Sequence, residues 1–134
     1  MIGKLPSDIL TVLLETLPIE FSVINSEDRV IAWNKNDTRI YAIPKNILGA
    51  DVRDCHSNKS IDLIDRMLSE MKSGKREKAR FWKNVRIKDK SEEQKVLSEY
   101  YALRDLTGKY LGCMEVSLNI SDIQRISGEK RLLE

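Results

Sequence analysis

The second half of the chain contains three runs in which apolar and polar residues alternate, separated by short polar turns. The runs cover residues 77–88, 94–104 and 109–120. Alternation with a period of two is typical of strands that bury one face, and connections this short join antiparallel neighbours. The pattern therefore predicts a three-stranded antiparallel meander, and such a sheet needs a covering layer on one face.

The first half of the chain predicts two more strands and the helices that could cover the sheet. Alternating runs at residues 19–25 and 29–34 flank a short polar turn, which is typical of an antiparallel hairpin. Residues 59–72 carry apolar side chains at helical spacing and are followed by Gly74, a pattern that predicts an amphipathic helix. The expected fold class is α+β, with a five-stranded antiparallel sheet covered on one face by helices.

Both ends of the chain predict flanking helices around a core at residues 18–120. Residues 1–17 are expected to form a short amphipathic helix that stops before Pro18. Residues 121–134 are expected to form a helix that leaves the domain. The apolar side chains on both segments exceed what one small sheet can hide, which favours a homodimer. The expected dimer residues are Ile9, Val12, Leu13, Ile123 and Ile126.

The composition of the chain excludes several classes of protein function. A length of 134 residues indicates one domain, and 23 basic against 21 acidic residues are too balanced for a nucleic-acid-binding protein. One His and two widely separated Cys fit neither a zinc site nor a disulfide framework. No apolar stretch is long enough to span a bilayer, and the N-terminus lacks the features of a signal peptide. We therefore expect a cytoplasmic protein that binds neither nucleic acid nor membrane.

Motifs of catalysis are missing from the sequence. A Ser-His-Asp arrangement would have to use His56, the single histidine, and no Gly-x-Ser-x-Gly elbow is present. The six glycines are scattered and form no phosphate-binding loop. We therefore expect a protein without catalytic activity of its own.

Three segments, in this order along the chain, resemble parts of PAS domains. Residues 23–34 resemble the opening hairpin of the family, and residues 47–52, Ile-Leu-Gly-Ala-Asp-Val, resemble its LG-x-x-V step. Residues 108–116, followed by Asn-Ile-Ser at 119–121, resemble the last strand and the start of the signalling helix, where PAS domains usually have Asp-Ile-Thr. The resemblance extends over residues 18–126.

A narrower likeness is to the PAS modules that accompany hemerythrin-like domains in some bacterial and archaeal proteins. Those modules share a Cys-His step before the long helix, a strand that starts with Phe-Trp and a YFAVRD strand. Here these read Cys55-His56, Phe81-Trp82 and Tyr-Tyr-Ala-Leu-Arg-Asp at residues 100–105. The resemblance implies a sensor in which the sheet and helices enclose a ligand pocket. It also implies dimerisation through terminal helices, with a fused or separate effector domain.

Alternation and helical spacing predict which side chains meet inside that pocket. Methionines tolerate varied ligands, and Tyr or Trp can offer a polar group to a ligand. The expected function is therefore binding of a small apolar or mixed ligand, with a signal passed on through helix packing. The expected ligand-binding residues are Trp33, His56, Ile64, Met67, Met71, Phe81, Tyr100 and Met114.

Two alternatives stay open at the level of the sequence. In the first, His56 is the axial ligand of a haem iron in a gas or redox sensor, because haem-binding PAS domains place a His near this helix. A flavin is not expected, because Cys55 is followed by His-Ser-Asn and not by the flavin-binding segment of the family. In the second alternative, side chains fill the pocket and the chain is a ligand-free interaction or dimerisation module.

Overall fold

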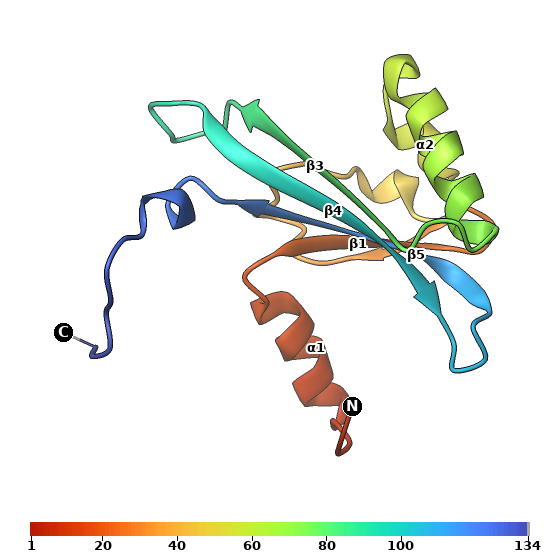
Figure 1. Ribbon diagram of the computed structural model, residues 1–134, viewed down its shortest axis with the longest axis horizontal. Coiled ribbons are helices and arrows are strands. Elements are labelled where there is room, and N and C mark those ends of the chain that lie inside the picture. Colours follow the sequence, from red (N-terminus) through yellow and green to blue (C-terminus); the bar gives the residue numbers. More distant parts are fainter. Residues whose placement is uncertain (134) are drawn as a thin grey trace.

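Five strands form one antiparallel sheet in the order β2-β1-β5-β4-β3 (Figure 1). The computed structural model describes residues 1–133. The strand order confirms the predicted fold class and joins the hairpin to the meander through β1 and β5, so that the last strand lies at the centre. The strands are β1 (Glu20–Asn25), β2 (Val30–Trp33), β3 (Lys78–Val85), β4 (Gln94–Arg104) and β5 (Tyr110–Asn119).

Two α-helices lie on opposite sides of this sheet (Figure 1). α2 (Asn58–Lys72) packs on one face, where its apolar side chains are buried with residues of β1 and β5. α1 (Ser7–Thr16) projects from the other side, and none of its residues is buried. The structure also has short 3-10 helices at Lys45–Ile47, Val52–Cys55 and Ile123–Arg125.

The sequence of α2 explains both its packing and its end. Its buried residues recur at helical spacing, so they form one stripe along the helix. The stripe consists of Ile64, Met67, Leu68 and Met71. Gly74 ends the helix with a φ of 81°, a left-handed conformation that other residues rarely adopt. The N–H of Gly74 donates to the Met71 carbonyl, one of the last carbonyls of the helix, and the Arg104 side chain binds the same carbonyl. The predicted helix at residues 59–72 is confirmed.

The register of the ladder decides which strand residues face α2. Ser22 and Tyr100 pair with Glu115 on either side, so these three side chains share one face. Cys113, two residues before Glu115, belongs to the same face and is buried in the core. Met114 lies between them and therefore points to the opposite face, away from α2, whereas the sequence predicted it inside the pocket.

The two flanking segments differ from each other. The predicted N-terminal helix is present as α1, and Pro18 lies just beyond its end. After β5 the chain forms a single 3-10 turn at Ile123–Arg125 in place of the helix predicted over 121–134, of which residue 134 lies outside the described part. Ile126 is extended directly after the 3-10 turn, with a ψ of 129°, and Gly128 adopts a left-handed φ of 65°, so a right-handed helix cannot continue through these residues. No helix within residues 1–133 has the length and apolar character needed to cross a bilayer.

Candidate functional site

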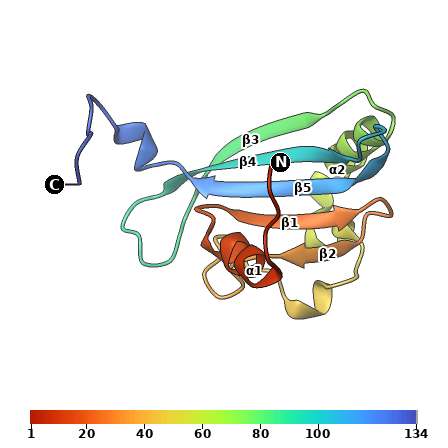
Figure 2. The same cartoon turned by 90° about the horizontal axis from the view of Figure 1, so that it is seen from below.

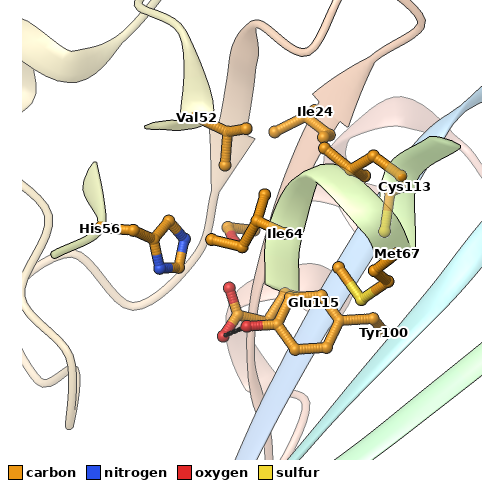
Figure 3. Close-up of a pocket in the computed structure, with 10 residues that line it drawn as sticks. Ile24, Val52, His56, Ile64, Met67, Tyr100, Cys113 and Glu115 are labelled. Carbon is orange, nitrogen blue, oxygen red and sulfur yellow. Dashed lines mark hydrogen bonds between the residues drawn. The ribbon is translucent and has the colours of Figure 1, made fainter. Parts of the chain in front are cut away.

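A cavity of about 670 Å³ lies between the sheet, α2 and the loop that precedes α2. An inner niche of about 30 Å³ shares most of its lining with this cavity (Figure 3). The walls are mainly apolar, whereas the floor carries Ser22, Tyr100 and Glu115 from three neighbouring strands. A mostly apolar cavity with a few polar groups at fixed positions is typical of a small-molecule site.

Glu115 and Tyr100 form the polar centre of the floor. The Tyr100 hydroxyl donates to Oε1 of Glu115 at 2.9 Å (Figure 3). Burial, together with the charge of Glu115, raises the pKa of Tyr100, so this hydroxyl keeps its proton at neutral pH. The Phe81 ring meets Tyr100 edge-on, with centroids 5.8 Å apart and planes at 79°. Aromatic surface and a carboxylate therefore lie side by side in the cavity.

His56 reaches the niche from the side opposite Glu115 (Figure 3). It directly follows the Val52–Cys55 helix, which begins where the Asp51 carboxylate accepts the N–H of Arg53 at 2.9 Å. Burial lowers the pKa of His56 below its usual value, while the charge of Glu115 raises it and that of Lys83 lowers it to smaller extents. The imidazole is therefore neutral at neutral pH.

A buried ion pair outside the predicted site shapes the mouth of the cavity. The side chains of Arg39 and Glu20 are 5% and 4% exposed, and their closest charged atoms are 3.9 Å apart. Arg39 also donates to three backbone carbonyls at 2.9 Å, which belong to Phe21, Asn34 and Tyr41. Glu20 accepts the backbone N–H groups of residues 40 and 41, at 2.6 and 3.1 Å. These bonds hold the loop against β1.

The loop held in this way places Tyr41 at the cavity mouth. The Lys83 ammonium of β3 lies 5.1 Å from the centroid of the Tyr41 ring, within the range of a cation–π contact. Sequence patterns did not indicate Glu20, Arg39 or Tyr41 as residues of the site. Glu20 occupies an ordinary polar position of an alternating strand, and residues 39–41 carry no pattern that predicts where they lie.

Asn34 links this cluster to α1. It is 1% exposed, and its Oδ1 accepts the N–H of Phe21 at 2.7 Å. Its Nδ2 donates to the carbonyls of Leu14 and Ile19, at 2.8 and 3.1 Å. Because Leu14 belongs to α1, one side-chain amide joins that helix to β1. The Asn34 carbonyl is also bound by Arg39, so α1, β1 and the cavity mouth share one hydrogen-bond network.

The structure brings part of the predicted ligand-binding set together. The members that line the cavity are His56, Ile64, Met67, Phe81 and Tyr100. Trp33 packs against the edge of the core instead, and its Nε1 donates to Asn36 at 3.1 Å. Met71 is fully buried near the C-terminal end of α2, and Met114 lies on the opposite face of the sheet. The main polar group of the floor, Glu115, was not among the predicted residues.

All of the predicted dimer residues are exposed: Ile9, Val12, Leu13, Ile123 and Ile126. Val12 is the most exposed of those in α1, at 64%. α1 and the segment after β5 leave the sheet at different places, so their apolar side chains form two separate surfaces (Figure 2). Pairing of these surfaces with a second copy stays a prediction.

The surroundings of His56 fit a haem ligand poorly. A histidine that binds iron usually donates its second ring N–H to a fixed acceptor. The one hydrogen bond of His56 within residues 1–133 comes from its backbone N–H to the Arg53 carbonyl. The Glu115 carboxylate also projects into the space in front of the ring, where an apolar porphyrin would lie (Figure 3). Haem binding through His56 stays a prediction, and these contacts argue against it.

Comparison with known proteins gives the family. The sequence profile described as "PAS domain" matches residues 10–121. The chain belongs to the PAS domain family. Members of this family are typically sensory modules, in agreement with the resemblance found in the sequence. A search of curated protein sequences gives no match.

Solved structures share the fold at low sequence identity. The C-terminal domain of a Streptococcus mutans protein is 22% identical, with a TM-score of 0.84 over 95% of this chain and 94% of that one. The PAS domain of BvgS from Bordetella pertussis is 16% identical, with a TM-score of 0.61 over 88% and 90%. VqmA bound to DPO is 12% identical, with a TM-score of 0.60 over 85% of this chain and 57% of that one.

We expect an NMR pH titration of His56, the single histidine, to give a midpoint below the usual 6.5. Glu115→Gln removes a charge that raises the pKa of His56, so the midpoint should fall further. Lys83→Gln removes a charge that lowers this pKa, so the midpoint should rise. Shifts in the same direction, or none, would contradict the arrangement of the two charges around the ring.

The depressed pKa of His56 also has a consequence for stability. As the pH falls from above 6.5 through the folded-state pKa, the unfolded chain binds the proton first. The contribution of His56 to the free energy of unfolding is therefore lost in this window and is fully present above it.

We expect Asn34→Ala to lower the free energy of unfolding by about 2–4 kcal/mol, because a buried N–H and two carbonyls lose their partner. Hydrogen exchange of the α1 amides should accelerate more than that of α2. Asn36→Ala is the control, because the Asn36 side chain is bonded only to the side chains of Trp33 and Asp37. Equal effects of both variants on α1 would show that Asn34 does not hold the helix.

Proposed function

We propose that this chain is a sensory receptor domain that binds a small molecule in the cavity and has no catalytic activity of its own. The observation that carries the proposal is the polar floor beneath apolar walls. A carboxylate at the centre of a mostly apolar lining, with one oxygen open to the cavity, offers a ligand a polar group to bind, and a core filled only by side chains needs no such group. The volume of about 670 Å³ suits a small molecule. VqmA, which shares the fold, is bound to DPO.

The proposed signal leaves the cavity through the network around Arg39 and Asn34. A ligand that contacts Tyr41 at the mouth acts on residues that Glu20 and Arg39 hold against β1. The same Arg39 binds the Asn34 carbonyl, and Asn34 binds the end of α1. The ligand changes the packing of α1 only as far as it favours one arrangement of this network over another. A fused or separate effector domain would respond to that change.

A second copy of the chain is the proposed partner of α1. The helix presents Ile9, Val12 and Leu13 to solvent on the side of the sheet away from α2. The nearby strands carry Phe21 and Val116 on that outer face, where both are only half-buried. Two such surfaces related by a two-fold axis cover each other, which removes the exposed apolar area from water.

Native mass spectrometry and a thermal-shift screen test the receptor. We expect either a ligand mass retained above the 15.5 kDa chain or compounds that raise the melting temperature. Ser22→Phe places a ring on the cavity floor and should abolish both effects. Val23→Phe makes the same type of change one residue further on, at the opposite face, and should preserve them.

A ligand-free mass together with no stabilising compound would contradict the receptor and favour the interaction module. Addition of hemin tests the haem alternative in the same preparation. A Soret shift that is lost in His56→Ala would replace the proposed ligand by haem, whereas no shift, or a shift that persists in the variant, excludes haem held by His56.

We expect light scattering at high protein concentration to give twice the 15.5 kDa of one chain. Val12→Glu places a charge in the centre of the proposed interface and should give the single-chain mass. Leu106→Glu is the control, because Leu106 is fully exposed in the turn between β4 and β5. A single-chain mass for the unchanged protein, or dimers that Val12→Glu leaves intact, would overturn the proposed interface.

A further inference from the structure

Glu115 is a carboxylate in the middle of the cavity floor that forms no salt bridge with any other residue that the structure describes. Within residues 1–133 its one polar contact is the Tyr100 hydroxyl, which binds Oε1 at 2.9 Å. Its other oxygen faces the cavity, since Glu115 lines both the cavity and the inner niche. Glu20, on the same face of the neighbouring strand, contrasts with it: two backbone N–H groups and Arg39 surround that carboxylate.

None of the basic side chains that line the cavity forms a salt bridge with Glu115. Arg39, from the loop, is bound to Glu20 and to three backbone carbonyls. Lys83, from β3, lies over the Tyr41 ring at the mouth. His56 is neutral at neutral pH because burial lowers its pKa. In the described part of the chain, the carboxylate on the floor thus forms no ion pair, although its charge acts on Arg39 at a longer distance: burial lowers the pKa of Arg39, and the charges of Glu20 and Glu115 raise it to smaller extents.

The side chains next to Glu115 favour a cation. Tyr100 and Phe81 bring two aromatic rings to the same part of the cavity, and the faces of such rings attract positive charge. The apolar side chains of Ile24, Ile64 and Met67 line the same niche, so a ligand packed against them displaces water next to Glu115, which strengthens the attraction between opposite charges. The Lys83 ammonium already makes a cation–π contact of this kind with Tyr41, another aromatic ring of this cavity.

We propose that the ligand of this cavity is a small organic cation, whose protonated nitrogen donates to Glu115 while its apolar part packs beneath α2. The chemical class covers amines, amidines and protonated nitrogen heterocycles that contain a single ring or are of similar size. The cavity volume of about 670 Å³ is large enough for such molecules. This inference rests on the proposed receptor function and narrows it to one charge class. It assigns Glu115 as the residue that selects for that charge.

Three probes of nearly identical shape test the charge preference: benzamidine, benzamide and benzoate, which are cationic, neutral and anionic at pH 7. Each is titrated into the isotopically labelled chain, and the affinity is taken from NMR shifts of Ile64, Met67 and Tyr100. We expect benzamidine to bind about tenfold or more tightly than benzamide, and benzoate to bind weakest, because a hydrogen bond between charged groups is stronger than a neutral one.

Glu115→Gln keeps the shape of the side chain and an acceptor for Tyr100 but removes the charge. In this variant benzamidine should lose about tenfold in affinity, while the affinity for benzamide stays within about threefold. Glu99→Gln is the matched control, because Glu99 precedes Tyr100 on β4 and points to the opposite face of the sheet. This variant should leave the order of the three binding affinities unchanged. Thermal unfolding of both variants verifies that they are folded.

The outcomes separate this inference from the receptor function. Equal binding of the three probes at the cavity, or a preference for benzoate, would contradict the proposal that the ligand is a cation. Neither result would contradict the proposed receptor function. A preference for benzamidine that persists in Glu115→Gln overturns the assignment of Glu115. If no probe shifts the cavity residues, the inference fails, and the receptor is then judged by native mass spectrometry of the purified chain.

Discussion

The buried carboxylate of Glu20 and the guanidinium of Arg39 hold together parts of the chain that are far apart in the sequence. An ion pair away from water adds little stability by itself, because the loss of hydration offsets the attraction. Here the backbone supplies the remaining partners, since two N–H groups bind Glu20 and three carbonyls bind Arg39. Loss of either side chain would leave the other buried and unpaired, at a cost of about 3–5 kcal/mol. The cavity mouth depends on this pair.

The two halves of α2 differ in how they pack against the rest of the protein. Leu68 and Met71 are almost completely buried and pack into the core, so the C-terminal half anchors the helix to the sheet. Ile64 and Met67, one turn earlier, are buried too, but they also line the main cavity. Of the cavity and its inner niche, Leu68 lines only the niche and Met71 lines neither. A helix fixed at one end in this way can support an open space without losing its place on the sheet. The proposed receptor function therefore rests on uneven packing along a single helix.

Sequence patterns were sufficient for the elements whose residues are close together in the chain. The helical spacing of Ile64 and Met67 identified one wall of the cavity, because a stripe of apolar residues can face only the sheet. In β5 the same reasoning failed, since Met114 is more apolar than Glu115 and yet Glu115 is the residue under the helix. Alternation shows that a strand has two faces, and it does not decide which of them is covered.

The sequence by itself determined the family, the five strands, α1 and α2, because these follow from local periodicity and short motifs. Only the tertiary structure decided that Arg39 meets Glu20, that Asn34 meets the end of α1 and that Glu115 has the Tyr100 hydroxyl as its side-chain partner and no salt bridge within residues 1–133. These contacts join residues up to 20 positions apart or depend on strand register. They arise when the packed sheet removes polar groups from water and leaves only specific neighbours as partners.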